Sequence, residues 1–145
     1  MTALRYEDVT AGDEIPPLVK CPDTRQLVMY AGASDDYTPI HYDKDLAAEA
    51  GHRSVIVHGA LKSAFLAQML TDWIGEPGRI DELSVSYRAV DYAGDPLTCR
   101  GRVREKRIED GRYLVSCDVW IENAGGAVTT PGSAVASLPS KVACT

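Results

Sequence analysis

Positive charge is scarce in this sequence. Its 145 residues include 15 lysines and arginines against 21 aspartates and glutamates, which gives a formal net charge of −6. A protein that binds nucleic acid needs a basic stripe to offset phosphate repulsion, so we expect no nucleic-acid partner. The balance leaves room for an anionic small ligand, because such a ligand responds to local charge.

Long apolar runs are also missing. No stretch approaches the roughly 18 uninterrupted apolar residues of a membrane span. The first eight residues, MTALRYED, hold two acids and no apolar run, so we expect no signal peptide. These absences predict a cytoplasmic protein with no membrane partner.

The cysteines form no metal-binding motif. Four occur, at positions 21, 99, 117 and 144, none as C-x-x-C, and the three histidines do not cluster with them. We therefore expect no zinc or other metal. Cys99 and Cys117 lie in strand-like runs and are expected to be small buried apolar residues. Reduced thiols also fit a cytoplasm.

The composition is that of one soluble domain, with 45% hydrophobic and 25% charged residues. We predict a single domain over residues 1–145. After an extended lead-in at 13–22, the pattern predicts helices from 23 or 24 to about 33, over 46–50 and over 59–74. Apolar residues cover much of the last helix, so we expect it to be largely buried.

From Arg79 onward the apolar period changes to two. This predicts strands over 83–90, 97–104, 113–121 and 127–138. Short connections join the last of these strands, which should form an antiparallel meander. Helices followed by hairpins predict an α+β domain in which one long helix packs against a curved antiparallel sheet. Arginines at 100, 102 and 104 alternate with apolar residues; a solvated sheet face explains them better than a ligand patch does.

The segment Ser34-Asp35-Asp36-Tyr37-Thr38-Pro39-Ile40-His41 is the most informative part of the chain. Pro39 prevents a regular helix, so a stiffened loop can turn Asp36 and His41 toward one point. A carboxylate and an imidazole that converge can hold a water molecule and exchange protons with it. Taken alone, the two residues are more often a turn former and a surface side chain.

A second motif, Ile56-Val57-His58-Gly59-Ala60, precedes the long helix. Together the two motifs resemble the MaoC-like (R)-specific enoyl-CoA hydratases and 3-hydroxyacyl dehydratases, whose motif runs Ser-Gly-Asp-x-Asn-Pro-x-His and then Ile-x-His-Gly-Met. The likeness continues through the hairpins and covers nearly the whole chain. This sequence departs from the family pattern at Thr38, where Asn is usual, and at Asp35, where Gly is common.

The resemblance implies a single hot-dog domain and a carbon–oxygen lyase that hydrates trans-2-enoyl thioesters of coenzyme A or acyl-carrier protein, or the reverse dehydration. It needs no cofactor beyond the thioester of the substrate. Asp36 and His41 are the expected acid–base pair, with their roles unassigned. Gly59 begins the long helix, where a free N–H and the helix dipole favour an oxyanion. Its missing Cβ is expected to let the thioester carbonyl approach closely. The expected substrate-binding residues are Tyr37, Thr38, His58 and Ala60. Taken alone, residues such as His58 and Tyr37 more often have a structural role.

Three other functions stay open. The chain can be a catalytic or supporting subunit of a heteromeric dehydratase. A hot-dog thioesterase would need a carboxylate on the central helix, where Gln68 and Asp72 are poorly placed. A non-catalytic acyl-CoA-binding module would not need the aspartate and histidine. Since a single sheet on one helix leaves long edges exposed, we expect a homodimer or a hetero-oligomer with a related hot-dog chain.

Overall fold

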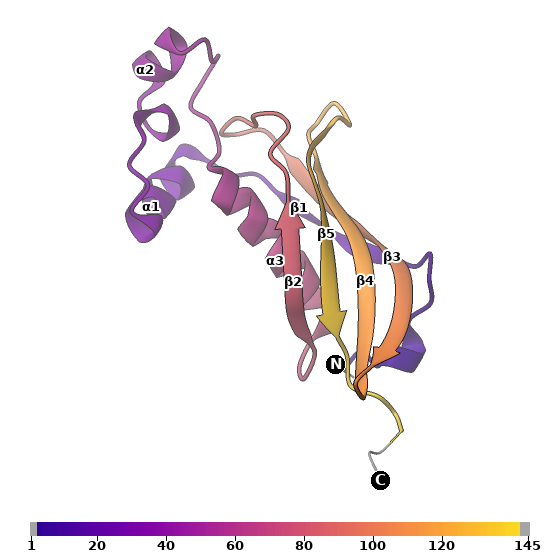
Figure 1. Ribbon diagram of the computed structural model, residues 1–145. Helices are drawn as coiled ribbons and strands as arrows, with labels where there is room; N and C mark the ends of the chain where they lie inside the picture. The colour runs from indigo at the N-terminus through magenta and orange to yellow at the C-terminus, as the bar shows by residue number, and fades with distance from the viewer. Residues whose placement is uncertain (1–2, 143–145) are drawn as a thin grey trace.

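The computed structural model describes residues 3–142, so Cys144 and the outermost ends of the predicted domain lie outside the described residues. The first half of the chain holds its helices (Figure 1). They are α1 (Thr24–Ser34), α2 (Lys44–Glu49) and α3 (Gly59–Ile74), with short 3₁₀ helices at Tyr6–Asp8 and at Pro39–His41, the latter called η2. All three predicted helices are thus confirmed. Within residues 3–142, no helix is both long and apolar enough to cross a membrane.

Five antiparallel strands form one sheet in the order β1-β3-β4-β5-β2. Consecutive β3, β4 and β5 pair as neighbours, which confirms the meander of the last strands, whereas β2 pairs with β5 and not with β3. The lead-in is itself an edge strand, whose register shifts at Pro16 and Pro17 because proline donates no hydrogen bond. The bounds are β1 (Glu14–Lys20), β2 (Arg79–Val85), β3 (Leu97–Glu109), β4 (Arg112–Glu122) and β5 (Val128–Ser137).

Two of the predicted strands had wrong boundaries. The strand expected over 83–90 runs from Arg79 to Val85, because it pairs with β5 from Ser137 to Gly132 and then leaves regular pairing. The strand expected over 97–104 continues to Glu109, because β4 supplies partners along its whole length. Arg104 itself lies at the point where the β3–β4 register shifts.

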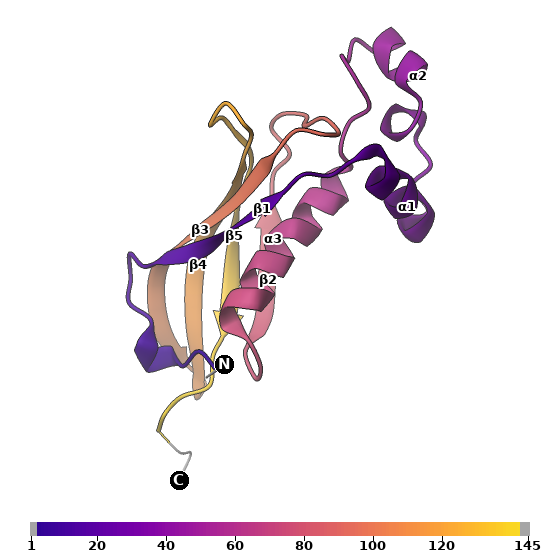
Figure 2. The same ribbon diagram turned by 180° about the vertical axis from the view of Figure 1, so that it is seen from behind.

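Helix α3 lies across one face of the curved sheet (Figure 2). Its buried residues follow a helical stripe, and its opposite face is exposed at Ala60, Ala64 and Gln68, so the prediction of a largely buried helix holds for one side only. The cause is that the sheet covers only one side of the helix (Figure 2). The stripe comprises Leu61, Lys62, Phe65, Leu66, Met69, Leu70 and Ile74. A long helix on a curved antiparallel sheet is the hot-dog arrangement.

The cysteine and arginine predictions are confirmed. Cys99 and Cys117 are buried in the core, and burial raises the pKa of each thiol to about 12. The arginines at 100, 102 and 104 lie on the solvated face, each in an ion pair with a carboxylate on a neighbouring strand.

Helices α1 and α2 lie beyond the N-terminal end of α3, away from the sheet (Figures 1 and 2). The chain between them carries the aspartate–histidine motif, and the chain after α2 leads directly into α3. Both motifs therefore meet at one end of the molecule. The N- and C-terminal segments lie together at the opposite end, where Tyr6 N–H donates to the Pro139 carbonyl (2.9 Å).

Candidate active site

The end of α1 turns the chain into the site. Asp35 caps the helix in the left-handed conformation (φ 55°), and Asp36 N–H donates to the Ala31 carbonyl (3.1 Å). This conformation explains why the family pattern favours glycine at this position. Aspartate is among the few other residues that adopt it readily, so Asp35 preserves the turn.

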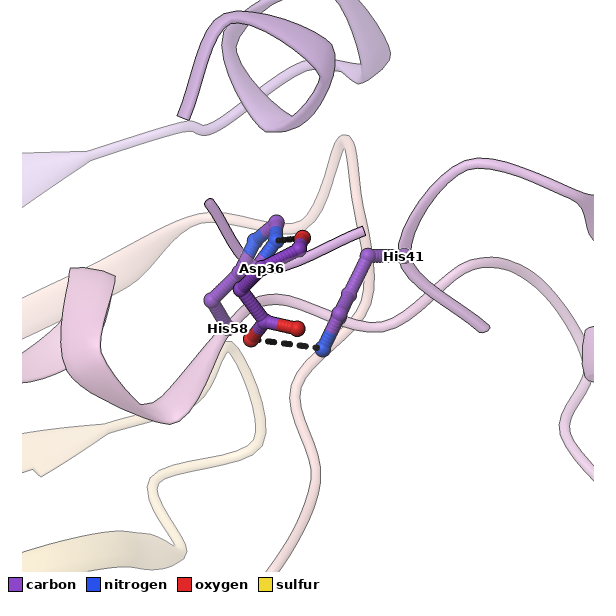
Figure 3. Close-up of side chains that lie close together, drawn as sticks. All are labelled: Asp36, His41 and His58. Carbon is purple, nitrogen blue, oxygen red and sulfur yellow. Dashed lines mark hydrogen bonds and ion pairs between the residues drawn. The ribbon is translucent and has the colours of Figure 1, made fainter. Parts of the chain in front are cut away.

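Pro39 then begins η2, where its missing N–H costs nothing. This short 3₁₀ turn brings His41 back toward Asp36. The Nε2 atom of His41 lies 3.7 Å from Oδ2 of Asp36, as Figure 3 shows. The two residues predicted as an acid–base pair therefore do converge.

Thr38, the departure from the family pattern, holds Asp36 in place. Its hydroxyl donates to Oδ1 of Asp36 at 2.7 Å, and its backbone N–H donates to the same atom at 3.3 Å. These two donors hold the pKa of Asp36 below its usual value. The structure thus gives Thr38 a partner within the site, whereas contact with substrate stays a prediction. Asp36 itself is half-exposed, with 44% of its side chain accessible.

His41 is in the opposite environment. It is buried, and its Nδ1 lies 2.8 Å from the Ile56 carbonyl. A carbonyl can only accept, so Nδ1 carries the proton. In the neutral imidazole, Nε2 then presents a lone pair toward Asp36. Two acceptors 3.7 Å apart cannot form a hydrogen bond with each other, but one water molecule between them can donate one hydrogen bond to each.

His58 lies directly behind His41. The two rings stack with centroids 3.7 Å apart, and Tyr30 meets His58 edge-on at 4.9 Å. His58 Nε2 lies 3.4 Å from the Asp36 backbone carbonyl, and its Nδ1 is buried with no partner in residues 3–142. Burial, and then the charge of His41, lower the pKa of His58. His58 therefore stays neutral and supports both members of the pair.

The donor atoms of Asp36, His41 and His58 lie within 4.8 Å of one another, a spacing that a metal ion could bridge. The ring stacking argues against it. An imidazole binds a metal in its own ring plane, at about 2.0–2.1 Å for zinc. The two ring planes are only 19° from parallel and are separated by the stack, so one ion cannot lie in both. The absence of a metal stays a prediction.

The N-terminus of α3 supplies free donors beside the pair. His58 is the N-cap without a side-chain capping bond, and the N–H groups of Gly59 and Ala60 have no acceptor within the described part of the chain. Gly59 is half-buried and Ala60 is exposed. An anionic oxygen near these two groups would be stabilised by both donors and by the helix dipole.

Tyr87 is a neighbour of the site that the sequence did not reveal. A Cβ added to Gly59 would lie 3.0–3.2 Å from three carbons of the Tyr87 ring. The Tyr87 and Ser63 hydroxyls are 2.6 Å apart, which tethers the ring to α3. This corrects one expectation: the space left by the missing Cβ holds an aromatic ring and is not open to a thioester. The sequence predicted Tyr87 as part of a strand over 83–90 but gave no sign of its contact with Gly59, because β2 ends at Val85 and Tyr87 follows it.

The tyrosine that was predicted as a site residue, Tyr37, lies on the outer side of the loop. Tyr37 is 58% exposed, and its carbonyl accepts a hydrogen bond from the Tyr42 hydroxyl (2.9 Å). This contact links the two ends of the loop, which fits the structural role expected for Tyr37. A role for Tyr37 in binding substrate stays a prediction.

Sequence comparison finds relatives of known activity. The chain is 28% identical over 115 residues to the (R)-specific enoyl-CoA hydratase of Aeromonas caviae, covering 79% of this chain and 84% of that protein. It is 28% identical over 119 residues to a mitochondrial 3-hydroxyacyl-acyl-carrier-protein dehydratase of Arabidopsis thaliana, covering 81% and 70%.

Solved structures of similar proteins have the same fold. The (R)-hydratase from A. caviae involved in PHA biosynthesis superposes with a TM-score of 0.84 at 25% identity, covering 92% of this chain and 99% of that one. A chain of the ChsH1–ChsH2 complex from Mycobacterium tuberculosis superposes with a TM-score of 0.78 at 25% identity, covering 89% and 98%. The family model described as the MaoC like domain matches residues 8–122. This chain therefore belongs to the MaoC-like domain family.

Proposed function

We propose that this chain adds water to trans-2-enoyl thioesters to give (R)-3-hydroxyacyl thioesters, or catalyses the reverse dehydration. The observation that carries the proposal is the pair of acceptors, Asp36 Oδ2 and His41 Nε2, 3.7 Å apart beside a helix N-terminus with free N–H groups. The named relatives, an enoyl-CoA hydratase and a 3-hydroxyacyl dehydratase, support the same reaction.

In this proposal the water donates one hydrogen to each acceptor. As its oxygen attacks C3 of the substrate, one proton passes to the pair, and the pair returns one proton to C2. The donors of Thr38 hold the pKa of Asp36 below its usual value, so Asp36 stays a carboxylate, and His41, whose Nδ1 donates to Ile56, presents the Nε2 lone pair to the water. His41 therefore carries the proton, while Asp36 orients the water and stabilises the imidazolium. The pair ends each turnover as it began.

Attack at C3 places negative charge on the thioester oxygen. The N–H groups at the start of α3, Gly59 first, are the donors for that oxygen, and such a donor is typically worth about 10²–10³ in rate. Every step uses protein groups, water and substrate, so we propose that no cofactor takes part. The acyl group is carried by coenzyme A or by the phosphopantetheine of a carrier protein.

The test is the ultraviolet absorbance of the enoyl thioester when purified protein is mixed with crotonyl-CoA. Loss of the enoyl absorbance with no release of free thiol supports hydration, and chiral analysis of the product tests the (R) configuration. Release of thiol would support a thioesterase instead. Gln68 and Asp72 give that alternative no support, since both lie on the exposed face of α3. Binding without turnover of any enoyl thioester would favour the acyl-CoA-binding module.

We also propose that the chain works as a homodimer or with a related hot-dog chain. Strands β1 and β2 are the two edges of the sheet, and a second chain could pair there. The likeness to a chain of the ChsH1–ChsH2 complex supports the heteromeric form. Light scattering on active protein expressed alone is the test. An active single-chain mass would defeat both forms, and a soluble but inactive product restored by a partner would favour the heteromer. The cytoplasmic location stays a prediction.

A further inference from the structure

A buried ion pair lies one helical turn from Gly59. Lys62 on α3 and Asp91, in the chain between β2 and β3, are 2% and 3% exposed, and Nζ of Lys62 lies 2.9 Å from Oδ2 of Asp91. The same ammonium donates to the Ala89 carbonyl (3.0 Å), and the hydroxyl of Thr129 on β5 donates to the same carboxylate oxygen (2.7 Å). The reaction proposed above uses none of these groups.

A contribution to protein stability does not by itself explain why the chain has this buried ion pair. Removing two charges from water carries a desolvation cost that often cancels their attraction, so well-packed apolar residues of similar volume commonly serve as well or better. The exposed pairs on the sheet, such as Arg104 with Asp118, incur little of this cost. The first turn of a helix is also the end where a positive side chain is least favourable. These arguments point to geometry as the role of the buried pair.

A continuous chain of hydrogen bonds joins the pair to His41. The Asp91 backbone carbonyl accepts from Val57 N–H (2.8 Å), and the Ile56 carbonyl accepts from Nδ1 of His41 (2.8 Å). Ile56 also forms an isolated antiparallel bridge with Tyr92, which follows Asp91 directly. Asp91 therefore holds, through its backbone, the short segment that orients the His41 ring.

The same pair fixes the start of α3. Lys62 N–H donates to the His58 carbonyl (3.2 Å) in the first turn of the helix, and its ammonium ties that turn to Asp91 and Ala89. The segment so attached also carries Tyr87, whose ring lies against Gly59. One buried network thus joins the N–H donors at the start of α3 to the Ile56–Val57 segment that binds the His41 ring.

We propose that Lys62 and Asp91, completed by Thr129, are positioning residues that set His41 and the Gly59 N–H relative to each other. The inference rests on the proposed hydratase function. It predicts that loss of the network lowers kcat while leaving the fold and the binding of substrate largely unchanged.

The main variant is Lys62→Met with Asp91→Leu, which replaces both charges by apolar side chains of similar size. The matched control is Arg104→Gln with Asp118→Asn, which removes an exposed ion pair far along the sheet. We expect the buried double variant to fold and to lose at least about tenfold in kcat, since small displacements of catalytic groups have effects of this order. Its KM should stay within about threefold of wild type, and the control should match wild type in both constants. Wild-type kcat in the folded buried variant overturns the inference.

Two further measurements cover the other cases. If the double variant does not fold, Thr129→Val removes only the hydroxyl, and Thr129→Ser keeps it as the control. A lower kcat for Thr129→Val than for Thr129→Ser supports the network. Equal kcat values overturn it. The Nδ1–H resonance of His41, assigned by its loss in His41→Gln, should move in any folded variant that lacks the network. If wild-type protein hydrates no enoyl thioester, the proposed function fails separately, and an unmoved resonance then overturns the positioning role.

Discussion

The two side chains that we propose as the acid–base pair belong to regions of opposite character. Asp36 lies in an exposed loop (residues 35–40) whose contacts are local, such as those from Thr38 to Asp36. His41 faces a buried segment (residues 55–59) that is held by residues far along the chain, including Asp91. One member of the pair can therefore adjust when substrate binds, while the other is set by the fold. The following changes test that contrast, from the largest expected effect to the smallest.

Removing either member should have the largest effect. His41→Gln and Asp36→Asn should each lower kcat by about 10²-fold or more, because each removes an acceptor of the reacting water. Only His41→Gln should also reduce stability, by about 1 kcal/mol, since it disturbs the buried bond to Ile56. Turnover assays and urea unfolding of both variants are the measurements. Near-normal turnover by either would end the pair assignment, and equal stability loss in both would erase the contrast.

The start of α3 comes next. Gly59→Val should lower kcat by about 10²–10³ as the N–H donor is obstructed. The smaller change Gly59→Ala places a methyl against the Tyr87 ring, so Tyr87→Ala in the same chain should recover part of the lost activity. The measurement is kcat and KM for Gly59→Ala, Tyr87→Ala and the combined variant. If the combined variant is no better than Gly59→Ala, the methyl acts on the substrate and not on Tyr87.

A moderate effect should appear in the titration of Asp36. The donors of Thr38 hold the pKa of Asp36 below its usual value, so its carboxylate should stay ionised as pH falls until that low pKa is reached. Thr38→Val removes the hydroxyl donor and should raise the pKa of Asp36, which moves the titration of its side-chain carboxyl, followed by NMR, to higher pH. Thr38→Ser, the control, keeps the donor and the wild-type titration.

Thr38→Asn restores the usual family residue. Its amide can donate to Asp36 in place of the hydroxyl, so activity should be kept or raised. A large loss of rate would mean that this loop is built around the shorter side chain. A titration of Asp36 that is identical in Thr38→Val and wild type would show that the hydroxyl does not control the pKa of Asp36.

The smallest effect should come from the outer side of the exposed loop. Tyr42→Phe removes the bond to the Tyr37 carbonyl, and it should change the free energy of unfolding by no more than about 1 kcal/mol. The kcat should stay close to wild type, since the bond lies on the solvent side of the pair. A loss approaching that of Asp36→Asn would show that the loop is rigid and that its exposure does not make it adjustable.

The sequence predicted the local half of this site and missed the other half. Asp36, Pro39 and His41 follow one another within a few residues, so turn chemistry and spacing were enough to bring them together. Burial of Lys62 and Asp91 was not predictable, because a lysine in an amphipathic helix and an aspartate before a turn normally face water. The contact of Tyr87 with Gly59 depends on where β2 leaves the sheet, and that boundary was itself predicted wrongly.

The ends of the chain have a practical consequence for protein engineering. Tyr6 and Pro139 are bonded at the end of the sheet opposite the active site. A short linker could therefore connect the segments that carry Tyr6 and Pro139, and the chain could be opened at the Asp110–Gly111 turn between β3 and β4. Such a circular permutant would keep every contact that positions Asp36, His41 and Gly59. The order in which the elements are synthesised could then be varied while the geometry of the reaction stays the same.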